Sequence, residues 1–330
     1  MKSGMRWSNA LFLQLGVLAG VAMLAICVGA THVPVRVVGA ALIGKAAGAA
    51  QTIVMDIRLP RVLLGIAIGG GLGLAGVLLQ GMFRNPLVEP YTLGISGGAA
   101  LGLCVCVTLK LANLLGAVAF PLCGFIGATG TAVLVYGVGA RRGIMQIRDV
   151  VLVGVMVSFV CSSLVMLIMA LARAEDLYGI VFWTMGSLDA PMPGLTAIAL
   201  AVALGVLAVA YLLAVRLNAL ALGEDGALHL GVDVERTKRM LFVMAALLTG
   251  VCVSVAGIIG FVGLVVPHVA RMLVGRDHRI LLVSSFLCGS IFLIGCDILA
   301  RTLVAPIELP IGVVTGIAGG ALFVYLLRRT

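Results

Sequence analysis

The four histidines and eight cysteines are the side chains of this sequence that could bind a metal or attack a substrate. The histidines, none of which stands at metal-ligand spacing from another, are His32, His229, His268 and His278. The cysteines, all in apolar runs and none in a CxxC pair, are Cys27, Cys104, Cys106, Cys123, Cys161, Cys252, Cys288 and Cys296. Such cysteines are typical of small buried hydrophobic residues, so the sequence predicts neither a metal site nor a disulfide framework.

Neither nucleotide binding nor proton transfer has a complete set of residues. Residues 39–46, GAALIGKA, match the phosphate-loop pattern except for the final hydroxyl residue that would bind magnesium. We therefore expect that this chain binds no ATP.

Proton-coupled transporters usually need an ionisable residue deep in a span. The best candidates, Asp297 and Arg301, have the spacing of an i,i+4 ion pair near the outer interface, and the scarcity of other such acids disfavours a proton relay.

The elements that hold these residues must be membrane helices. The chain has 330 residues, of which 62% are hydrophobic and 11% charged, and its mean hydropathy is +1.24. A soluble domain would carry about 25% charged residues. The first apolar run, residues 11–30, is longer than the roughly 7–15 residues of a signal-peptide core, so we interpret it as a retained span. The sequence therefore predicts a single transmembrane domain over residues 1–330.

Apolar runs that could cross a bilayer number ten, and we predict an all-α polytopic membrane protein. These runs are residues 10–30, 61–80, 91–109, 114–139, 150–172, 193–215, 240–259, 262–274, 280–300 and 310–327. The third and eighth are short and contain or follow proline.

The distribution of basic residues predicts that both termini are cytoplasmic. With ten spans and the N-terminus inside, 15 of the 22 basic residues lie on the inner side. The seven on the outer side are Arg36, Lys45, Arg58, Arg61, Lys110, Arg173 and Arg301. Topology thus accounts for most of the net charge of +9, and no nucleic-acid partner is needed.

A weak internal repeat relates two glycine-rich segments. Residues 75–94 match residues 256–275 at 5 of 20 positions, and the glycines of residues 58–98 are typical of helices whose backbones pack closely in membranes. The two copies begin at the second and seventh spans, so an inverted repeat would relate spans 2–5 to spans 7–10. We expect residues 83–91 to form an inner turn and residues 263–271, their counterpart, to lie near the outer face.

The longest polar segment is the loop of residues 216–239. Residues 219–222 and 227–230 are predicted to form two short helices with a break near Gly223–Gly226, and Gly231 would end the second. The loop is either a solvated linker or an interaction surface. Apolar residues at helical spacing favour the surface.

Six stretches together resemble the FecCD-type permeases of bacterial ABC importers, which move ferric siderophores, haem or cobalamin. They are RLPR (58–61), LAGVLLQGMFRNPLVEPYTLGISGGA (74–99), WTMGSL (183–188), LGEDGALHLGV (222–232), GFVGLVVPHVARMLVGRDHR (260–279) and ELPIGVVTGIAGGALFVYLLRR (308–329). The resemblance implies a type II ABC importer permease in the bacterial inner (plasma) membrane. It also implies a homodimer in contact with membrane lipid, two ATPase subunits that use ATP and magnesium, and a periplasmic binding protein.

The resemblance also implies roles for particular residues. Arg58, Arg61 and Arg301 resemble outer-surface arginines that receive acidic residues of the binding protein; as exposed pairs worth about 0.2–1 kcal/mol each, they would steer docking. The expected ATPase-coupling residues are Leu222, Gly223, Glu224, Asp225, Leu230 and Gly231. In the segment of residues 141–148, Gln146 and Ile147 would lie at the inner gate, where some relatives have small hydroxyl residues.

Two alternatives to an ATP-driven permease with alternating access remain at this point: a secondary transporter driven by an ion gradient, and a membrane anchor or scaffold. The coupling-like loop and the scarcity of buried acids disfavour the secondary transporter. The short broken helix in each half disfavours the anchor or scaffold, which would not need one. The substrate is left open among haem, siderophore and cobalamin, with a preference for iron in a chelate or haem. Arg173 is interpreted either as a contact for substrate carboxylates or as an interfacial charge.

Overall fold

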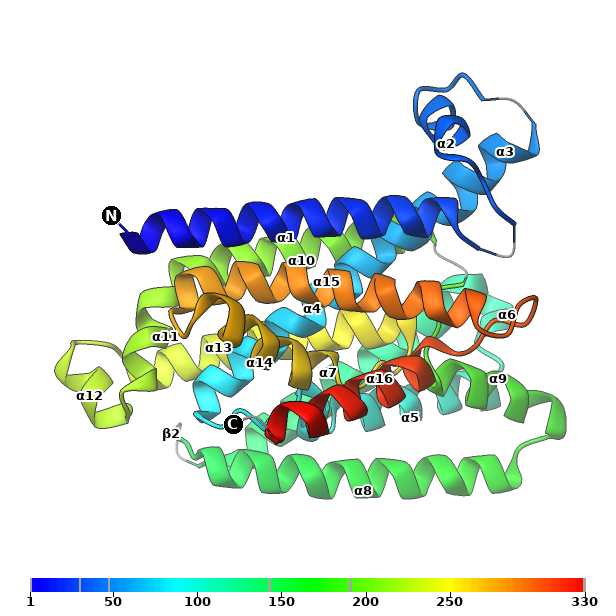
Figure 1. Ribbon diagram of the computed structural model, residues 1–330. Coiled ribbons are helices and arrows are strands. Elements are labelled where there is room, and N and C mark those ends of the chain that lie inside the picture. The colour runs from blue at the N-terminus through cyan, green and yellow to red at the C-terminus, as the bar shows by residue number, and fades with distance from the viewer. Residues whose placement is uncertain (1, 30, 47, 142–143, 190–191, 329–330) are drawn as a thin grey trace.

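The computed structural model describes residues 2–29, 31–46, 48–141, 144–189 and 192–328, which are almost entirely helical (Figure 1). The α-helices are α1 Lys2–Cys27, α2 Val35–Leu42, α3 Ala49–Thr52, α4 Leu59–Phe83, α5 Ile95–Thr108, α6 Ala112–Leu115, α7 Ala119–Gly139, α8 Ile147–Leu171, α9 Ala174–Thr184, α10 Pro193–Leu212, α11 Ala214–Ala221, α12 Glu224–His229, α13 Val234–Ala256, α14 Val262–Val274, α15 His278–Thr302 and α16 Ile311–Leu327. The other elements are the π-helical η1 Ile53–Arg58, the 3-10 helices η2 Pro90–Leu93 and η3 Gly116–Val118, and the strands β1 Ala140–Arg141 and β2 Ile144–Met145.

Every predicted span coincides with an apolar helix. Among the described residues, 7 helices are long and apolar enough to cross a membrane, and three shorter apolar helices cover Ile95–Thr108, Val262–Val274 and Ile311–Leu326. The first two of these shorter helices are the predicted third and eighth spans. The helices of the outer layer also leave large apolar side chains exposed, such as Phe159 and Leu171 on α8. Apolar surface of this kind is typical of a chain that faces lipid.

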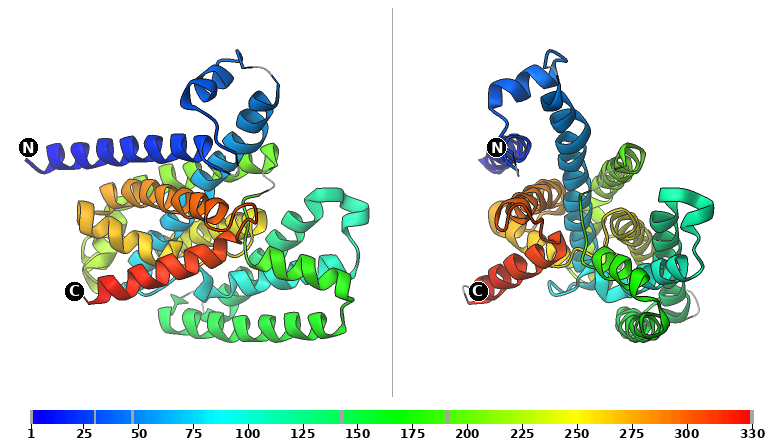
Figure 2. Two further views of the ribbon diagram at one scale, coloured as in Figure 1. Left: turned by 45° about the vertical axis from the view of Figure 1, so that its right-hand side comes forward. Right: turned by 90° about the vertical axis from the view of Figure 1, so that its right-hand side faces the viewer.

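Helix α4 is the centre of the bundle, surrounded by α10, α13, α14 and α15 (Figure 2). Its glycines lie against neighbouring backbone. A Cβ atom added at Gly69 would lie 2.3 Å from the carbonyl oxygen of Gly289 on α15, and one at Gly76 would lie 2.0 Å from that of Gly263 on α14. This confirms that the small residues let helix backbones approach closely, since only glycine leaves enough room at these contacts.

The bundle has two ends, which carry different elements. The N-terminus, α12 and the start of α8 lie at one end, called the α12 end, and α2, α3 and α6 lie at the other, called the α2 end (Figure 1). Helices α5, α7 and α8 pack on one another as a group beside the central helices (Figure 2).

The two turns that follow α4 and α13 meet inside the bundle. The backbone N–H of Phe261 donates to Glu89 Oε1 at 2.7 Å, and the N–H of Ile259 donates to Tyr91 Oη at 3.1 Å. From this internal turn, α14 runs to the α12 end, where Arg271 donates to Gln80 near the end of α4.

The prediction that residues 263–271 lie near the face opposite residues 83–91 is therefore wrong. The reason is that the turn before α14 lies within the bundle and not at its surface. A helix of 13 residues, about 20 Å long, then ends beside the turn that follows α4.

Candidate functional site

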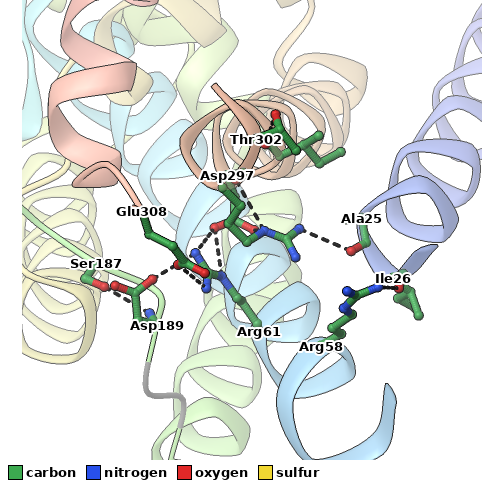
Figure 3. A network of polar contacts seen from close by, with 11 residues as sticks. Ala25, Ile26, Arg58, Arg61, Ser187, Asp189, Asp297, Thr302 and Glu308 are labelled. Carbon is green, nitrogen blue, oxygen red and sulfur yellow. Dashed lines mark hydrogen bonds and ion pairs between the residues drawn. The ribbon is translucent and has the colours of Figure 1, made fainter. Parts of the chain in front are cut away.

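Arg61 is the centre of a buried ion-pair network at the α2 end (Figure 3). It stands in the first turn of α4, directly after Pro60, so the helix start fixes its direction. Its guanidinium lies 2.8 Å from a carboxylate oxygen of each of three acids: Asp189 after α9, Asp297 on α15 and Glu308 before α16. One arginine therefore ties three segments to the start of α4.

Arg301 and Arg58 extend this network to the C-terminal end of α1. Arg301 Nε lies 3.1 Å from Asp297 Oδ2, which confirms the predicted i,i+4 pair, and Arg301 donates to the Ala25 carbonyl at 3.1 Å. Arg58 donates to the carbonyls of Ile26 at 2.7 Å and Cys27 at 3.0 Å. The last carbonyls of a helix have no partner within the helix and carry partial negative charge, so two arginines stabilise this end of α1.

The structure confirms that these three arginines are neighbours, but the expectation that they are exposed is wrong. The exposed fractions are 5% for Arg58, 6% for Arg61 and 5% for Arg301. Apart from Asp297, which stands four residues before Arg301, their partners come from far along the chain, and no local pattern around an arginine predicts them.

The charges that face solvent in this network are acidic. The side chains of Asp189 and Glu308 are 54% and 37% exposed, whereas that of Asp297 is only 3% exposed. Three arginines and three acids make the network neutral as a whole. The docking role of the arginines stays a prediction, and the structure adds Asp189 and Glu308, which the sequence analysis missed.

The predicted coupling loop does form two short helices at the α12 end. They are α11 and α12, and the break between them falls at Leu222–Gly223, so the second helix begins at Glu224 and not at residue 227 as predicted. Gly223 and Gly231 have φ angles of +113° and +76°, which glycine adopts readily. Leu222 and Leu230, like Leu228, are more than half exposed.

The acids of this loop differ in their contacts. Glu224 lies 3.2 Å from Lys238 on α13, whereas Asp225 is exposed and its backbone carbonyl is bonded to the ring of His229. The predicted coupling residues thus share one surface, with Glu224 attached to the bundle behind it.

The predicted gate segment connects α7 to α8. Residues 142 and 143 lie outside the described residues; around them, Ala140 and Arg141 pair with Met145 and Ile144 in an antiparallel hairpin. Gln146 is exposed at the N-cap of α8, and Ile147 packs against the hydrophobic core. The other predicted contact residue, Arg173, is exposed at the N-cap of α9.

A basic cavity of about 520 Å³ lies between the ends of α4 and α14 and the start of α15. Arg84, Arg271 and Arg276 line it together with His268, whose Nε2 atom has no hydrogen-bond partner among the described residues.

Asp277 is the N-cap of α15 beside this cavity, and the pKa of its carboxyl group is lowered. Burial alone would raise that pKa, but the hydrogen bonds from Asn218 and the Arg279 N–H, with the charges of Arg279 and His278, outweigh it.

The fold and the two ends define a multi-pass membrane protein, because apolar helices packed through glycine surround α4 and the polar networks described above lie at the ends. A model described as the FecCD transport family matches residues 17–329. The chain therefore belongs to the FecCD transport family, whose members are the permease subunits of ABC transporters. It is a transport subunit and not itself an enzyme.

Known proteins similar to this chain agree. The hemin transport system permease protein HmuU of Yersinia pestis is 39% identical over 277 residues, which cover 83% of either protein. The cobalamin import system permease protein BtuC of Halobacterium salinarum is 39% identical over 279 residues, 84% of this chain and 74% of that relative. A solved structure described as an inward-facing conformation of a metal-chelate type ABC transporter is similar to this chain with a TM-score of 0.86 and 30% sequence identity. The match covers 98% of this chain and 100% of that chain. These relatives favour ATP-driven import over an ion-gradient transporter.

Proposed function

We propose that this chain forms the path by which an importer carries an iron chelate, haem or cobalamin from the periplasm to the cytoplasm. The observation that supports it best is the match over more than four fifths of the chain to permeases named for hemin and for cobalamin. Both relatives are equally identical to this chain, so they do not choose between the substrates. The preference for iron in a chelate or haem remains from the sequence analysis, and Arg173 remains a candidate contact for carboxylates.

The protein would lie in the inner membrane, and the proposed orientation places its α12 end in the cytoplasm. The bias of 15 basic residues against 7 supports this orientation, since cytoplasmic segments are enriched in lysine and arginine. Both termini would then be cytoplasmic, and the α2 end would face the periplasm.

Two ATPase subunits would bind at the α12 end of a homodimer of this chain, with the loop of residues 216–239 as the coupling element of a single permease domain. The exposed leucines at 222, 228 and 230 support this contact, because apolar side chains beside charged ones are typical of protein interfaces. ATP and magnesium would be used in those subunits, and this chain would bind no cofactor.

The periplasmic binding protein would dock at the α2 end. Because Arg61 already holds three acids, an acidic residue of the binding protein would have to displace an exposed one, Glu308 or Asp189. Such an exchange leaves the number of ion pairs unchanged. Docking would thus steer and orient the partner, and it would change the contacts that join α16 to α4.

Reconstitution of the full importer tests the proposal. The chain would be co-expressed with its ATPase subunits, placed in lipid vesicles, and supplied with binding protein loaded with haem, a ferric siderophore or cobalamin. We expect one class of loaded binding protein to stimulate ATP hydrolysis and uptake. Uptake without any ATPase subunit would contradict the proposal.

A further inference from the structure

A buried lysine at the α12 end joins three elements that are far apart in the sequence. Lys238 lies in α13, and its side chain is 2% exposed. Its ammonium group lies 2.9 Å from the Met145 carbonyl in β2, 3.2 Å from Glu224 in α12 and 2.6 Å from Glu235 in α13. A lysine ammonium has three protons to donate, and here all three have an acceptor.

Glu235 completes the connection to the gate hairpin, defined as the paired strands β1 and β2. Its Oε2 atom accepts a hydrogen bond of 2.8 Å from the Met145 N–H, while its Oε1 atom faces Lys238. Both backbone polar groups of Met145 are therefore held by side chains of α13. Since α8 begins two residues later, at Ile147, the start of α8 is held as well.

This attachment matters because it fixes one end of α8. Helix α8 packs against α5 and α7, but most of its length lies at the outside of the bundle. On the other side of Lys238, Glu224 is the contact that links α12 to the same point. Separation of α12 from the gate hairpin would leave a buried ammonium with an incomplete set of partners, which is costly in a low-dielectric interior.

We propose that Lys238 is a positioning residue that fastens α12 to the gate hairpin, so that the two move as one body during the transport cycle. This inference rests on the proposed function, in which the ATPase subunits move α12 and the hairpin leads into the inner gate. Movement of α12 would reach the gate through Glu224, Lys238 and Met145. This contact joins distant parts of the chain, because 93 residues separate Met145 from Lys238.

The test compares Lys238→Met with Arg239→Met in the complete importer in vesicles. Arg239 is the next residue of α13, carries the same charge and is exposed, so it controls for the loss of charge. We expect Lys238→Met to assemble and hydrolyse ATP while uptake per ATP falls about 5-fold or more, the lower range of coupling between sites. Arg239→Met should keep the wild-type ratio.

Glu224→Ala gives a second variant in case the first lowers stability. It detaches only α12, because Lys238, Glu235 and Met145 keep their mutual contacts, and it should lower uptake per ATP in the same way. An unchanged ratio in both variants, or uptake and hydrolysis that fall in proportion with thermal stability, would overturn the inference.

A distance measurement separates coupling from stability. Spin labels at Gln146 and His229, in a background without the eight native cysteines, report the separation of the gate from α12. We expect this distance to be the same with and without a non-hydrolysable ATP analogue in the wild type, and to differ between the two states in Lys238→Met. If the distance in Lys238→Met is the same with and without the ATP analogue, the role of Lys238 is contradicted. If the wild-type chain binds no ATPase subunit, the proposed function and this role are contradicted together.

Discussion

Replacing two glycines of α4 by alanine should separate this helix from its neighbours. In the double variant Gly69→Ala/Gly76→Ala, the new Cβ atoms would lie 2.3 Å and 2.0 Å from the backbone oxygens of Gly289 and Gly263. Real Cβ atoms do not approach closer than 3.0 Å, so α15 must move by at least 0.7 Å and α14 by at least 1.0 Å. Backbone atoms cannot rotate away as a side chain can, and the two contacts involve different helices.

The size of the effect follows from overpacking and helix propensity. Overpacking of a filled core costs about 1–3 kcal/mol at each site, and alanine regains about 0.5–1 kcal/mol over glycine in a helix. With the middle of each range at both sites, the free energy of unfolding should fall by about 2.5 kcal/mol for the double variant. A gap of this size also removes a quarter to a half of the dispersion energy of the atom pairs that it separates.

The assay is the thermal inactivation of the purified protein in detergent, followed by size-exclusion chromatography. The matched control is Gly130→Ala/Gly205→Ala, two glycines in the spans α7 and α10 with no heavy atom within 4 Å of the added Cβ. We expect the control to unfold at or slightly above the wild-type temperature and the α4 variant several degrees below it. Equal melting temperatures for the two double variants would refute the argument that glycine is needed for the packing of α4.

Three further predictions concern the ends of the bundle. Arg61→Ala should lower the free energy of unfolding by about 3–5 kcal/mol, measured by thermal inactivation, because buried Asp297 loses one of its two cationic partners; full stability would contradict this. The folded pKa of Asp277 is lowered, so the stability that this carboxylate contributes is present above its unfolded pKa and is lost as the pH falls through its folded pKa. In a series from neutral to acidic pH, the melting temperature of Asp277→Asn should therefore fall less steeply than that of the wild type. Parallel curves for the two proteins would count against this role of Asp277. Leu230→Asp should weaken ATPase co-purification, whereas Leu114→Asp, at another exposed leucine on α6 at the other end, should not; equal loss in both would remove the α12 end as the binding surface.

Local features of the fold could be predicted well from the sequence. All ten apolar runs coincide with helices, since hydropathy is a sum over about 20 neighbouring residues and needs no knowledge of the partners. The Asp297–Arg301 pair could be predicted for the same reason, because helix geometry places i and i+4 side by side. The loop of residues 216–239 was rightly predicted to hold two short helices with a break beside a glycine, although their predicted bounds, 219–222 and 227–230, differ from α11 and α12.

The larger errors concern contacts that join distant segments. The expected outer position of residues 263–271 was wrong because the turn before α14 lies inside the bundle, against Glu89. Glu89 and Tyr91, which lie within the predicted inner turn of residues 83–91, contact the turn before α14, and the sequence pattern does not indicate these contacts.

The sequence by itself therefore determined that this protein is a polytopic helical permease, and where along the chain its apolar helices lie. Only the tertiary structure decided how those residues are used. Arg61 was expected to be free for a partner, but it meets Asp297 and Glu308, which are 236 and 247 residues away. Lys238 holds Met145 across 93 residues. The physical reason is that the cost of burying a charge depends on which acids the packing of the helices places within hydrogen-bond distance, and that packing is a property of the whole chain.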